Sequence, residues 1–264
     1  MNGEHDHSRL VRFARQMIFP PLGREGQRAM GNATALVVGV GGLGSWVAEL
    51  LARAGVGRLR LVDDDRVELT NIHRQALYDE ADAEAATPKV LAAAERIARI
   101  NAGVIVETAR TRLDRTNIST LAADVDLILD GTDSFATRFL INDFAVKHAR
   151  PWVFAGVVGA EAQTMTIVPP RTACLRCVLE GPPPPCSDPA CRSVGVLGPA
   201  VAAVAAIEAA EAMKILSGRG EQASPYLLKL DLWGNTVQRI DVSAAAANAD
   251  CPCCRHREFE FLEP

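Results

Sequence analysis

Residues 33–65 read ATALVVGVGGLGSWVAELLARAGVGRLRLVDDD, and this stretch decides the fold. Leu36 to Val38 form a short apolar run that is typical of a strand buried on both faces. Residues 39–44, GVGGLG, satisfy the pattern G-x-G-x-x-G, and Leu43 to Ala54 has helical periodicity. A second strand is predicted over Leu59 to Val62. The stretch therefore predicts a strand, a glycine turn, a helix and a second strand.

This order of elements favours nucleotide binding. Glycines let the backbone approach a phosphate closely, and the N-terminus of a helix presents free N–H groups to an anion. Asp63 follows the second strand, where a carboxylate can accept hydrogen bonds from ribose hydroxyls. The expected nucleotide contacts in the turn are Gly39, Gly41, Gly42 and Gly44. A tight turn without a ligand is the alternative, and NAD is the default nucleotide for this stretch alone.

The composition is that of a globular protein. Of 264 residues, 48% are hydrophobic and 23% are charged, and the net charge of -4 argues against a binder of nucleic acid. The first ten residues hold no apolar signal region. The most apolar segment, 194–216, contains Glu208, Glu211 and Lys214, which indicates a buried helix rather than a membrane span. We expect a cytoplasmic protein, whose seven cysteines serve metal or thiol chemistry rather than disulfides.

Strands and helices alternate through the first two thirds of the chain, as a doubly wound parallel sheet requires. The later part predicts an antiparallel extension, with a strand at 163–168 and a hairpin over 226–242. The fold class is therefore α/β, with a Rossmann-like, mostly parallel sheet. The other expected elements are strands at 104–107, 126–130 and 152–155, and helices at 89–100, 117–122, 134–148 and 198–216.

Two acids end the strand at 126–130, at the edge where ligands bind in open α/β sheets. These are Asp130 and Asp133, with Ser134 next to them as the expected cap of the following helix. A carboxylate beside a nucleotide is a candidate ligand for magnesium, which prefers oxygen donors and bridges phosphates. A dehydrogenase has no need of that magnesium.

Basic residues precede and follow the first two strands. Arg74 stands in the polar loop after Asp63 and is either a phosphate ligand or a solvated surface residue. Lys89 opens a helix, where it faces the helix dipole unfavourably unless it meets an anionic ligand. Residues 9–26, which include Arg15, form either an amphipathic helix that covers the sheet or a basic arm that reaches towards bound phosphate.

Two C-x-x-C pairs are the strongest metal signal in the chain. Each pair places two thiolates on one ion, and four thiolates close a tetrahedral zinc site with a structural role. Cys253 lies between the members of the second pair and is the expected spare; unmetallated free thiols are the alternative. The predicted zinc ligands are Cys174, Cys177, Cys251 and Cys254.

Cys186 and Cys191 stand in a proline-rich segment, residues 181–195, that we expect to be an exposed loop. An exposed cysteine beside Arg192 can have a lowered pKa and act as a nucleophile. The other interpretation is an incidental surface thiol.

Taken together, the motifs resemble the ThiF/MoeB/HesA family, which is similar to the ubiquitin-activating enzymes. They follow the family's order over about residues 8–256. The matching motifs are RFARQ (12–16), GVGGLG (39–44), LVDDDRVELTNIHRQ (61–75), Pro88-Lys89, Asp133 with Arg138, the two C-x-x-C pairs and CRSVGVLGP (191–199).

The resemblance implies an enzyme that uses ATP to adenylate the C-terminal glycine of a small ubiquitin-like sulfur carrier ending in Gly-Gly. It implies that Asp63 holds the ribose, that Asn71, Arg74 and Lys89 contact phosphates, and that Asp133 binds Mg²⁺. Such a reaction needs no strong base, because the attacking carboxylate is already an anion. Positioning and cations carry most of the catalysis.

Further expectations follow from the same resemblance. Arg15 reaches the site of the other subunit in a homodimer, and Asp65 and Ser134 complete the nucleotide contacts, although the family often has asparagine where Ser134 stands. Cys191 matches a loop cysteine that takes part in sulfur transfer. Another protein, such as a cysteine desulfurase or a rhodanese, then supplies sulfur for thiamine or molybdopterin synthesis. No nucleic-acid or membrane partner is expected.

We expect one adenylation domain over residues 1–264, with a helical arm (1–30), a nucleotide-binding core (31–160) and a carrier-binding, zinc-tied part (161–264). Three other functions are considered. An NAD-dependent oxidoreductase would leave the cysteine pairs, Arg74 and Lys89 without a role. A catalytically silent binding protein would have no need of the retained charged residues. A modifier-activating enzyme would instead form a thioester at Cys191.

Overall fold

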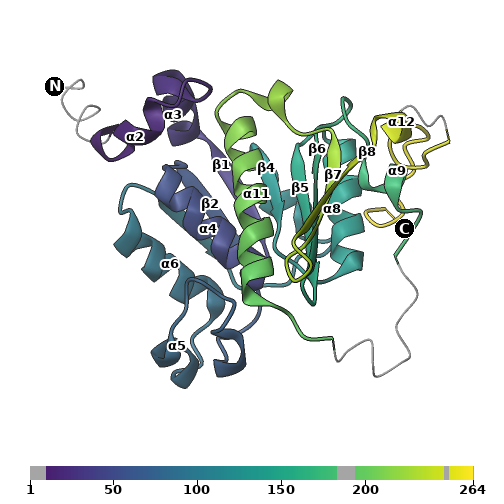
Figure 1. The fold of residues 1–264 in the computed structure, drawn as a ribbon. Coiled ribbons are helices and arrows are strands. Elements are labelled where there is room, and N and C mark those ends of the chain that lie inside the picture. Colours follow the sequence, from purple (N-terminus) through teal and green to yellow (C-terminus); the bar gives the residue numbers. More distant parts are fainter. Residues whose placement is uncertain (1–9, 183–193, 247–249, 264) are drawn as a thin grey trace.

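The structure is a computed structural model that describes residues 10–182, 194–246 and 250–263. Within these ranges one sheet of eight strands forms the centre of the molecule, in the order β3-β2-β1-β4-β5-β6-β7-β8 (Figure 1). The strands are β1 (Thr34–Val38), β2 (Arg58–Val62), β3 (Ile105–Ala109), β4 (Leu127–Asp130), β5 (Trp152–Val158), β6 (Glu161–Ile167), β7 (Tyr226–Asp231) and β8 (Thr236–Asp241).

The sheet has a parallel half and an antiparallel half. The five strands β1 to β5 are parallel to one another. Strand β1 lies between β2 and β4, so the strand order reverses there, as in a Rossmann-like fold. From β5 onwards each pair is antiparallel. The predicted fold class is thus confirmed: a Rossmann-like, mostly parallel sheet with an antiparallel extension towards the C-terminus.

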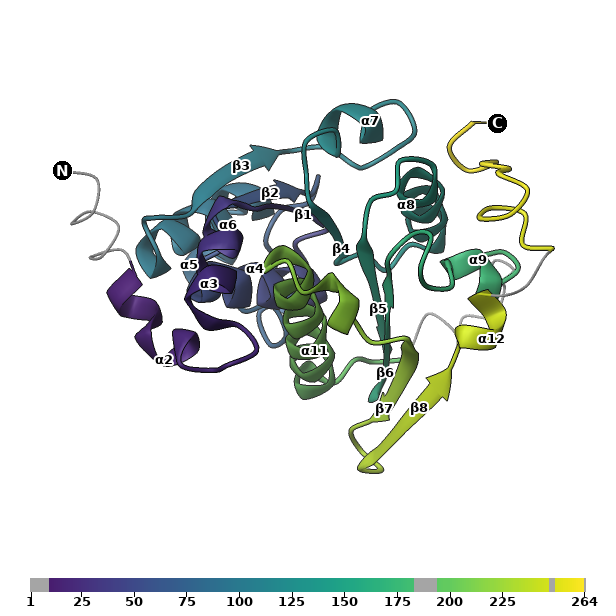
Figure 2. The ribbon, with the colours of Figure 1, turned by 90° about the horizontal axis from the view of Figure 1, so that it is seen from above.

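Helices cover both faces of the sheet (Figures 1 and 2). On one face α4, α6 and α11 pack over β1, β2, β4 and β5 around a core that includes Leu51, Ile97 and Val204. On the other face α7 and α8 cover a second core with Phe139 and Trp152. The helices are α2 (Ala14–Met17), α3 (Gly23–Asn32), α4 (Gly42–Ala54), α5 (Glu80–Glu84), α6 (Lys89–Ile100), α7 (Ile118–Leu121), α8 (Phe135–Lys147), α9 (Leu175–Val178), α11 (Gly198–Leu216) and α12 (Ser243–Ala246).

The N-terminal segment differs from the single amphipathic helix that one interpretation of residues 9–26 predicted. It forms a short 3-10 turn, α2 and then α3, with a break between the two helices. Pro20 and Pro21 fall in this break, and proline lacks the N–H that a helix interior needs. Ile18 and Phe19 are 69% and 60% exposed, so this part of the segment does not cover the sheet.

The apolar segment near residue 200 forms α11, and its hydrophobic residues pack against the sheet and α4. None of the helices in the described ranges combines the length and the hydropathy needed to cross a bilayer.

Candidate active site

The glycine turn between β1 and α4 is held by close backbone packing. Gly39 has a φ of +78°, and a Cβ there would lie 2.9 Å from the carbonyl oxygen of Gly131. A Cβ on Gly44 would overlap with the carbonyl oxygen of Gly39. These glycines therefore let β1, β4 and the first turn of α4 approach one another. No side chain among the described residues caps the N-terminus of α4, so its first N–H groups remain available to an anion.

A cleft of about 1080 Å³ opens at this turn, along the carboxyl ends of β1, β2 and β4. It continues over the antiparallel half of the sheet, where residues of β6, β7 and β8 form its wall. Most of the predicted nucleotide contacts line it. These are Gly39, Gly41, Gly42, Asp63, Asp65, Asn71, Arg74, Lys89, Asp133 and Ser134. Gly44 stands behind the turn and shapes it without lining the cleft.

Asp63 holds the loop beside the turn in place. One carboxylate oxygen accepts a hydrogen bond from the backbone N–H of Val40 at 2.7 Å, and the other accepts from the N–H of Asp65 at 2.8 Å. On the same side the hydroxyl of Tyr78 donates to the carbonyl of Val40. Because each carboxylate oxygen can accept more than one hydrogen bond, Asp63 remains able to accept from a ribose hydroxyl.

The cations at this end of the cleft have partners within the chain. Arg74 donates to the side-chain oxygen of Asn71 at 2.7 Å and to the carbonyl of Thr70 at 3.1 Å. The ammonium group of Lys89 lies 2.7 Å from a carboxylate oxygen of Asp65. Asp65, itself a predicted nucleotide contact, therefore holds Lys89 at the cleft that Lys89 lines.

Asp130 is buried beneath the cleft and does not line it, contrary to the expectation that both acids of this strand face the ligand. Arg138 forms an ion pair with it at 2.8 Å and also donates to the carbonyls of Thr132 and Ala155. Burial raises the pKa of Asp130, and Arg138 opposes that shift. Arg138 thus fixes the backbone that leads to Asp133, whose own carboxylate has no hydrogen bond or ion pair with any described residue.

Ser134 has a structural contact of its own. Its hydroxyl accepts a hydrogen bond from the backbone N–H of Thr137 at 3.3 Å and caps α8, as predicted. The hydroxyl therefore already has a backbone partner at the edge of the cleft.

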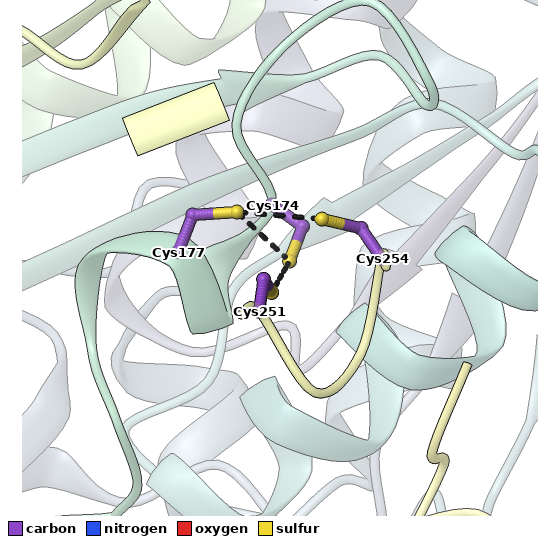
Figure 3. A group of neighbouring side chains, drawn as sticks. All are labelled: Cys174, Cys177, Cys251 and Cys254. Carbon is purple, nitrogen blue, oxygen red and sulfur yellow. Dashed lines mark hydrogen bonds between the residues drawn. The ribbon is translucent and has the colours of Figure 1, made fainter. Parts of the chain in front are cut away.

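Four cysteines from two distant parts of the chain come together beside α8 (Figure 3). The sulfur of Cys174 lies 3.6 Å from that of Cys251 and 3.7 Å from that of Cys177, and the sulfurs of Cys177 and Cys254 are 3.5 Å apart. A tetrahedral ion with metal–sulfur bonds of about 2.3 Å would hold its sulfurs about 3.8 Å apart, so the spacing fits zinc. Because the thiols share hydrogen bonds, the pKa of Cys174 is lowered and that of its partner Cys177 is raised.

Asn142 connects the two cysteine pairs. Its side-chain oxygen accepts a hydrogen bond from the backbone N–H of Leu175 at 2.8 Å, and its amide donates to the sulfur of Cys253 at 3.3 Å. Leu175 lies inside the first C-x-x-C pair and Cys253 inside the second. Asn142 is buried in α8, one turn after Arg138, so the cysteine cluster and the cleft are fixed to the same helix.

Comparison with known proteins identifies the family. Residues 13–253 match the family model described as the ThiF family. The chain belongs to the ThiF family. It is 39% identical over 252 residues to the "Sulfur carrier protein ThiS adenylyltransferase" of Bacillus subtilis, covering 95% of this chain and 73% of that protein. It is also 39% identical over 250 residues to the "Sulfur carrier protein adenylyltransferase" of Thermus thermophilus, covering 93% and 90%.

The fold has solved counterparts as well. A crystal structure of E. coli MccB, with "MccA-N7isoASN", superposes with a TM-score of 0.81 at 20% identity, over 93% of this chain and 74% of the MccB chain. At this identity the likeness concerns the fold alone.

Arg15, another predicted site residue of this ThiF-family chain, does not line the cleft. Arg15 is exposed on α2, next to Gln16, whose amide donates to the carbonyl of Ala54 at 2.9 Å. Ala54 ends α4, and a helix of 13 residues is about 20 Å long, so Arg15 lies far from the glycine turn of its own chain. Cys191, like Cys186, lies outside the described residues.

The hairpin of β7 and β8 contributes a wall of the cleft that the sequence patterns did not predict. Lys229 and Gln238 line it, together with Gln163 on β6. Alternation along the predicted strands could have placed each of these side chains on a face, but which face meets the cleft depends on how the antiparallel strands pack beside β5.

Proposed function

We propose that this ThiF-family chain adenylates the C-terminal glycine carboxylate of a small ubiquitin-like sulfur carrier protein, with ATP as the adenylyl donor. The observation that carries the proposal is the cleft itself. At the switch point of the sheet it gathers the uncapped N-terminus of α4, the cations Arg74 and Lys89, and a carboxylate, Asp133, that has no partner among the described residues. The printed names of the two bacterial relatives agree with this activity.

The chemistry suits a site that holds charge rather than a strong base. The carboxylate oxygen of the glycine attacks the α-phosphorus of ATP, the bond from that phosphorus to the bridging oxygen breaks, and pyrophosphate leaves. The attacking carboxylate carries no proton to remove. The barrier therefore comes from bringing anions together and from the charge on the leaving group, which positioned cations and N–H groups stabilise.

We assign the roles by position in the cleft. The N–H groups at the start of α4 and the side chains of Asn71, Arg74 and Lys89 contact the phosphates, and Asp63 accepts from the ribose. Lys89 exchanges part of its pairing with Asp65 for phosphate when ATP binds, so Asp65 sets how strongly the cation is held before binding.

Asp133 is the proposed magnesium ligand. Magnesium takes oxygen ligands, and the carboxylate of Asp133 stands in the cleft without a partner among the described residues. The ion would neutralise phosphate charge there. A structural Zn²⁺ on Cys174, Cys177, Cys251 and Cys254 is proposed from the sulfur spacing, and it would tie the C-terminal part of the chain to α8.

Arg15 is proposed to act in the site of a second copy of the chain, in a homodimer. Its position near the far end of α4 excludes contact with its own glycine turn, while its side chain is exposed and free to meet another subunit. The arm, the core and the zinc-tied part would then work as one adenylation domain over residues 1–264.

Sulfur transfer is the proposed next step, in thiamine or molybdopterin synthesis. Cys191 acts there as a secondary nucleophile, with a cysteine desulfurase or a rhodanese as the sulfur donor. Replacing Cys191 with alanine should leave adenylation unchanged and reduce thiolation of the carrier; equal thiolation would remove this role. Accumulation of a stable thioester on Cys191 would instead favour activation of a modifier that is ligated to proteins.

Exchange of labelled pyrophosphate into ATP tests the proposed function. With magnesium and a carrier ending in Gly-Gly, exchange should depend on the carrier, and Asp133→Ala should lower its rate by about 100-fold. Asp64→Ala is the matched control, because Asp64 also lines the cleft but stands beside Arg112 at 3.8 Å. Equal loss in both variants, or hydride transfer from NADH in place of exchange, would contradict the proposal.

A further inference from the structure

Lys229 is a cation of the cleft that has neither a role in the proposed chemistry nor a partner among the described residues. Five cations line the cleft, and four of them are paired with groups of the chain: Arg74, Lys89, Arg112 and Arg138. The fifth, Lys229 on β7, is exposed and has no hydrogen bond or ion pair with any residue in the described ranges. A binding cleft with one unneutralised cation favours a ligand that brings an anionic group to it.

The sheet register places Lys229 in the middle of a polar row. Gln163 of β6 is directly opposite Lys229, and Lys229 is directly opposite Gln238 of β8. Residues paired in this way project from the same face of the sheet, and all three line the cleft. Two residues with side-chain amides therefore flank Lys229, and their backbones lie about 5 Å from its own on either side, as the spacing of strands requires.

The neighbouring acids make no direct contact with the ammonium group of this row. Glu161 and Asp231 form the next row on the same face, at the first residue of β6 and the last residue of β7. One carboxylate oxygen of Asp231 already accepts hydrogen bonds from the backbone N–H groups of Trp233 and Gly234, at 3.0 Å each, and holds the hairpin turn. Neither acid forms an ion pair with Lys229.

The distance from the reaction site fits the reach of a short peptide. The strand β7 is three strands from β4, which leads to Asp133, and three strand spacings are about 14 Å. An extended chain advances about 3.3–3.6 Å per residue. If the terminal carboxylate meets ATP beside Asp133, a tail that crosses the sheet brings about its fourth residue before the terminal glycine to Lys229.

We propose that Lys229, flanked by Gln163 and Gln238, selects sulfur carriers that have an acidic side chain about four residues before the terminal glycine. The inference rests on the proposed function and adds to it a rule for which carrier is accepted. A carboxylate in the tail forms a charge-assisted hydrogen bond with the ammonium group, and the amides satisfy its remaining oxygen lone pairs. A basic side chain there meets Lys229 as a like charge.

The test compares carriers that differ in one tail residue. Aspartate, serine or lysine is placed in turn at the third, fourth and fifth residue before the terminal glycine, and KM for the carrier and for ATP is measured by pyrophosphate exchange. The wild type should bind the aspartate tail about three- to tenfold more tightly than the serine tail, with the largest difference at or next to the fourth residue. Lys229→Glu should reverse the preference, so that the lysine tail is favoured.

Arg239→Glu provides the matched control. This substitution makes the same change of charge on the same hairpin as Lys229→Glu. Arg239, however, stacks on the ring of Tyr226 and does not line the cleft. It should leave the preference between tails unchanged. KM for ATP should stay constant in both variants.

The outcomes separate the inference from the proposed function. If the wild type supports exchange but Lys229→Glu keeps the wild-type order of tails, the inference is wrong and the function stands. A rise in KM for ATP without a change in carrier preference would place Lys229 on the nucleotide and also overturn it. If the wild type itself supported exchange with none of the carriers, the proposed function and the tail rule would both be wrong.

Discussion

The glycine turn and the cysteine cluster bring chain segments together in opposite ways. At the turn, six consecutive residues let the backbones of β1, α4 and β4 touch, and the N–H groups of the helix remain open to the cleft. In the cluster, two pairs that are 77 residues apart meet through side chains, and Asn142 satisfies a backbone N–H and a thiol between them. The first arrangement leaves polar groups free for a ligand, whereas the second uses them internally.

This difference separates function from stability. Changes at the glycine turn should affect ligand binding even where the fold survives, because the backbone itself faces the ligand. Changes at the cysteine cluster should affect the fold and the retention of metal first. Each of the following variants tests one side of this comparison.

The largest effect is expected from Gly44→Ala. The added methyl group would overlap with the carbonyl of Gly39, and backbone on both sides must move, which should lower the free energy of unfolding by about 3 kcal/mol. Gly41→Ala is the matched control, because a Cβ there finds its nearest atom, in Gln75, 3.8 Å away. It should cost about 1 kcal/mol in stability yet weaken ATP binding. Urea denaturation and ATP titration measure both; equal stability of the two variants would break the comparison.

Next in size is the loss of a cysteine ligand. Cys251→Ser should reduce the affinity for zinc by more than the roughly 10- to 100-fold that changes behind the ligands cause. Cys253→Ser should retain one zinc per chain, because the group of four neighbouring sulfurs does not include Cys253. Elemental analysis after dialysis against a chelator distinguishes the two. Retention of zinc by Cys251→Ser and its loss from Cys253→Ser would reassign the ligand set.

Asn142→Ala should have a smaller effect on the same cluster. It leaves the N–H of Leu175 without its partner and frees the second cysteine pair, so zinc affinity should fall about tenfold. Asn101→Ala is the control: Asn101 is also buried, and its amide donates to the carbonyl of Ala52 at 2.8 Å, away from the cysteines. Both variants should lose stability, but only Asn142→Ala should release zinc faster to a chelator. Identical release rates would show that Asn142 has no role particular to the cluster.

The smallest effect is expected under the cleft, at Glu208. This carboxyl group is fully buried in α11, and neither oxygen has a hydrogen-bond partner among the described residues. Burial raises its pKa, the charge of Asp130 adds to that shift, and Arg138 opposes it. The folded state therefore holds a proton that the unfolded state releases, so stability falls as the pH rises above about 4.3 towards the folded-state pKa.

Glu208→Gln replaces the ionisable carboxyl group with a neutral amide and keeps the shape of the side chain. Its Tm should exceed that of the wild type by a margin that grows as the pH rises from about 5, for as long as the buried carboxyl group keeps its proton. A margin that is constant across this range would show that Glu208 does not titrate as its burial requires.

Local patterns were enough to predict most of the fold. The helix α11 has the predicted ends, Ser134 caps α8, and β7 and β8 form the hairpin that was predicted over 226–242. Each of these depends on residues close in sequence. The close approach of the glycine turn to Gly131 could not be predicted in detail, yet the glycines themselves indicated that some backbone would be near.

What the sequence did not reveal depends on packing between distant elements. The pairing of Lys89 with Asp65 joins the start of α6 to a loop 24 residues earlier. Asp130 is buried directly before Gly131, which lines the cleft. Its partner Arg138 comes from α8, and this contact cannot be predicted from the strand pattern. Lys229 enters the cleft because three antiparallel strands extend the sheet beyond β5. A periodic pattern assigns a face to each side chain but does not say what that face meets.

Attachment of an adenylyl group to the terminal glycine of a carrier is the reaction proposed for this chain. The most direct test is intact-mass spectrometry of a Gly-Gly-ending carrier after incubation with the enzyme, ATP, magnesium and pyrophosphatase. We predict that the carrier gains the mass of one adenylyl group, and that a carrier lacking its last glycine gains none. An equal adduct on the shortened carrier, or no adduct on carriers that bind the ATP-loaded enzyme, would contradict the account.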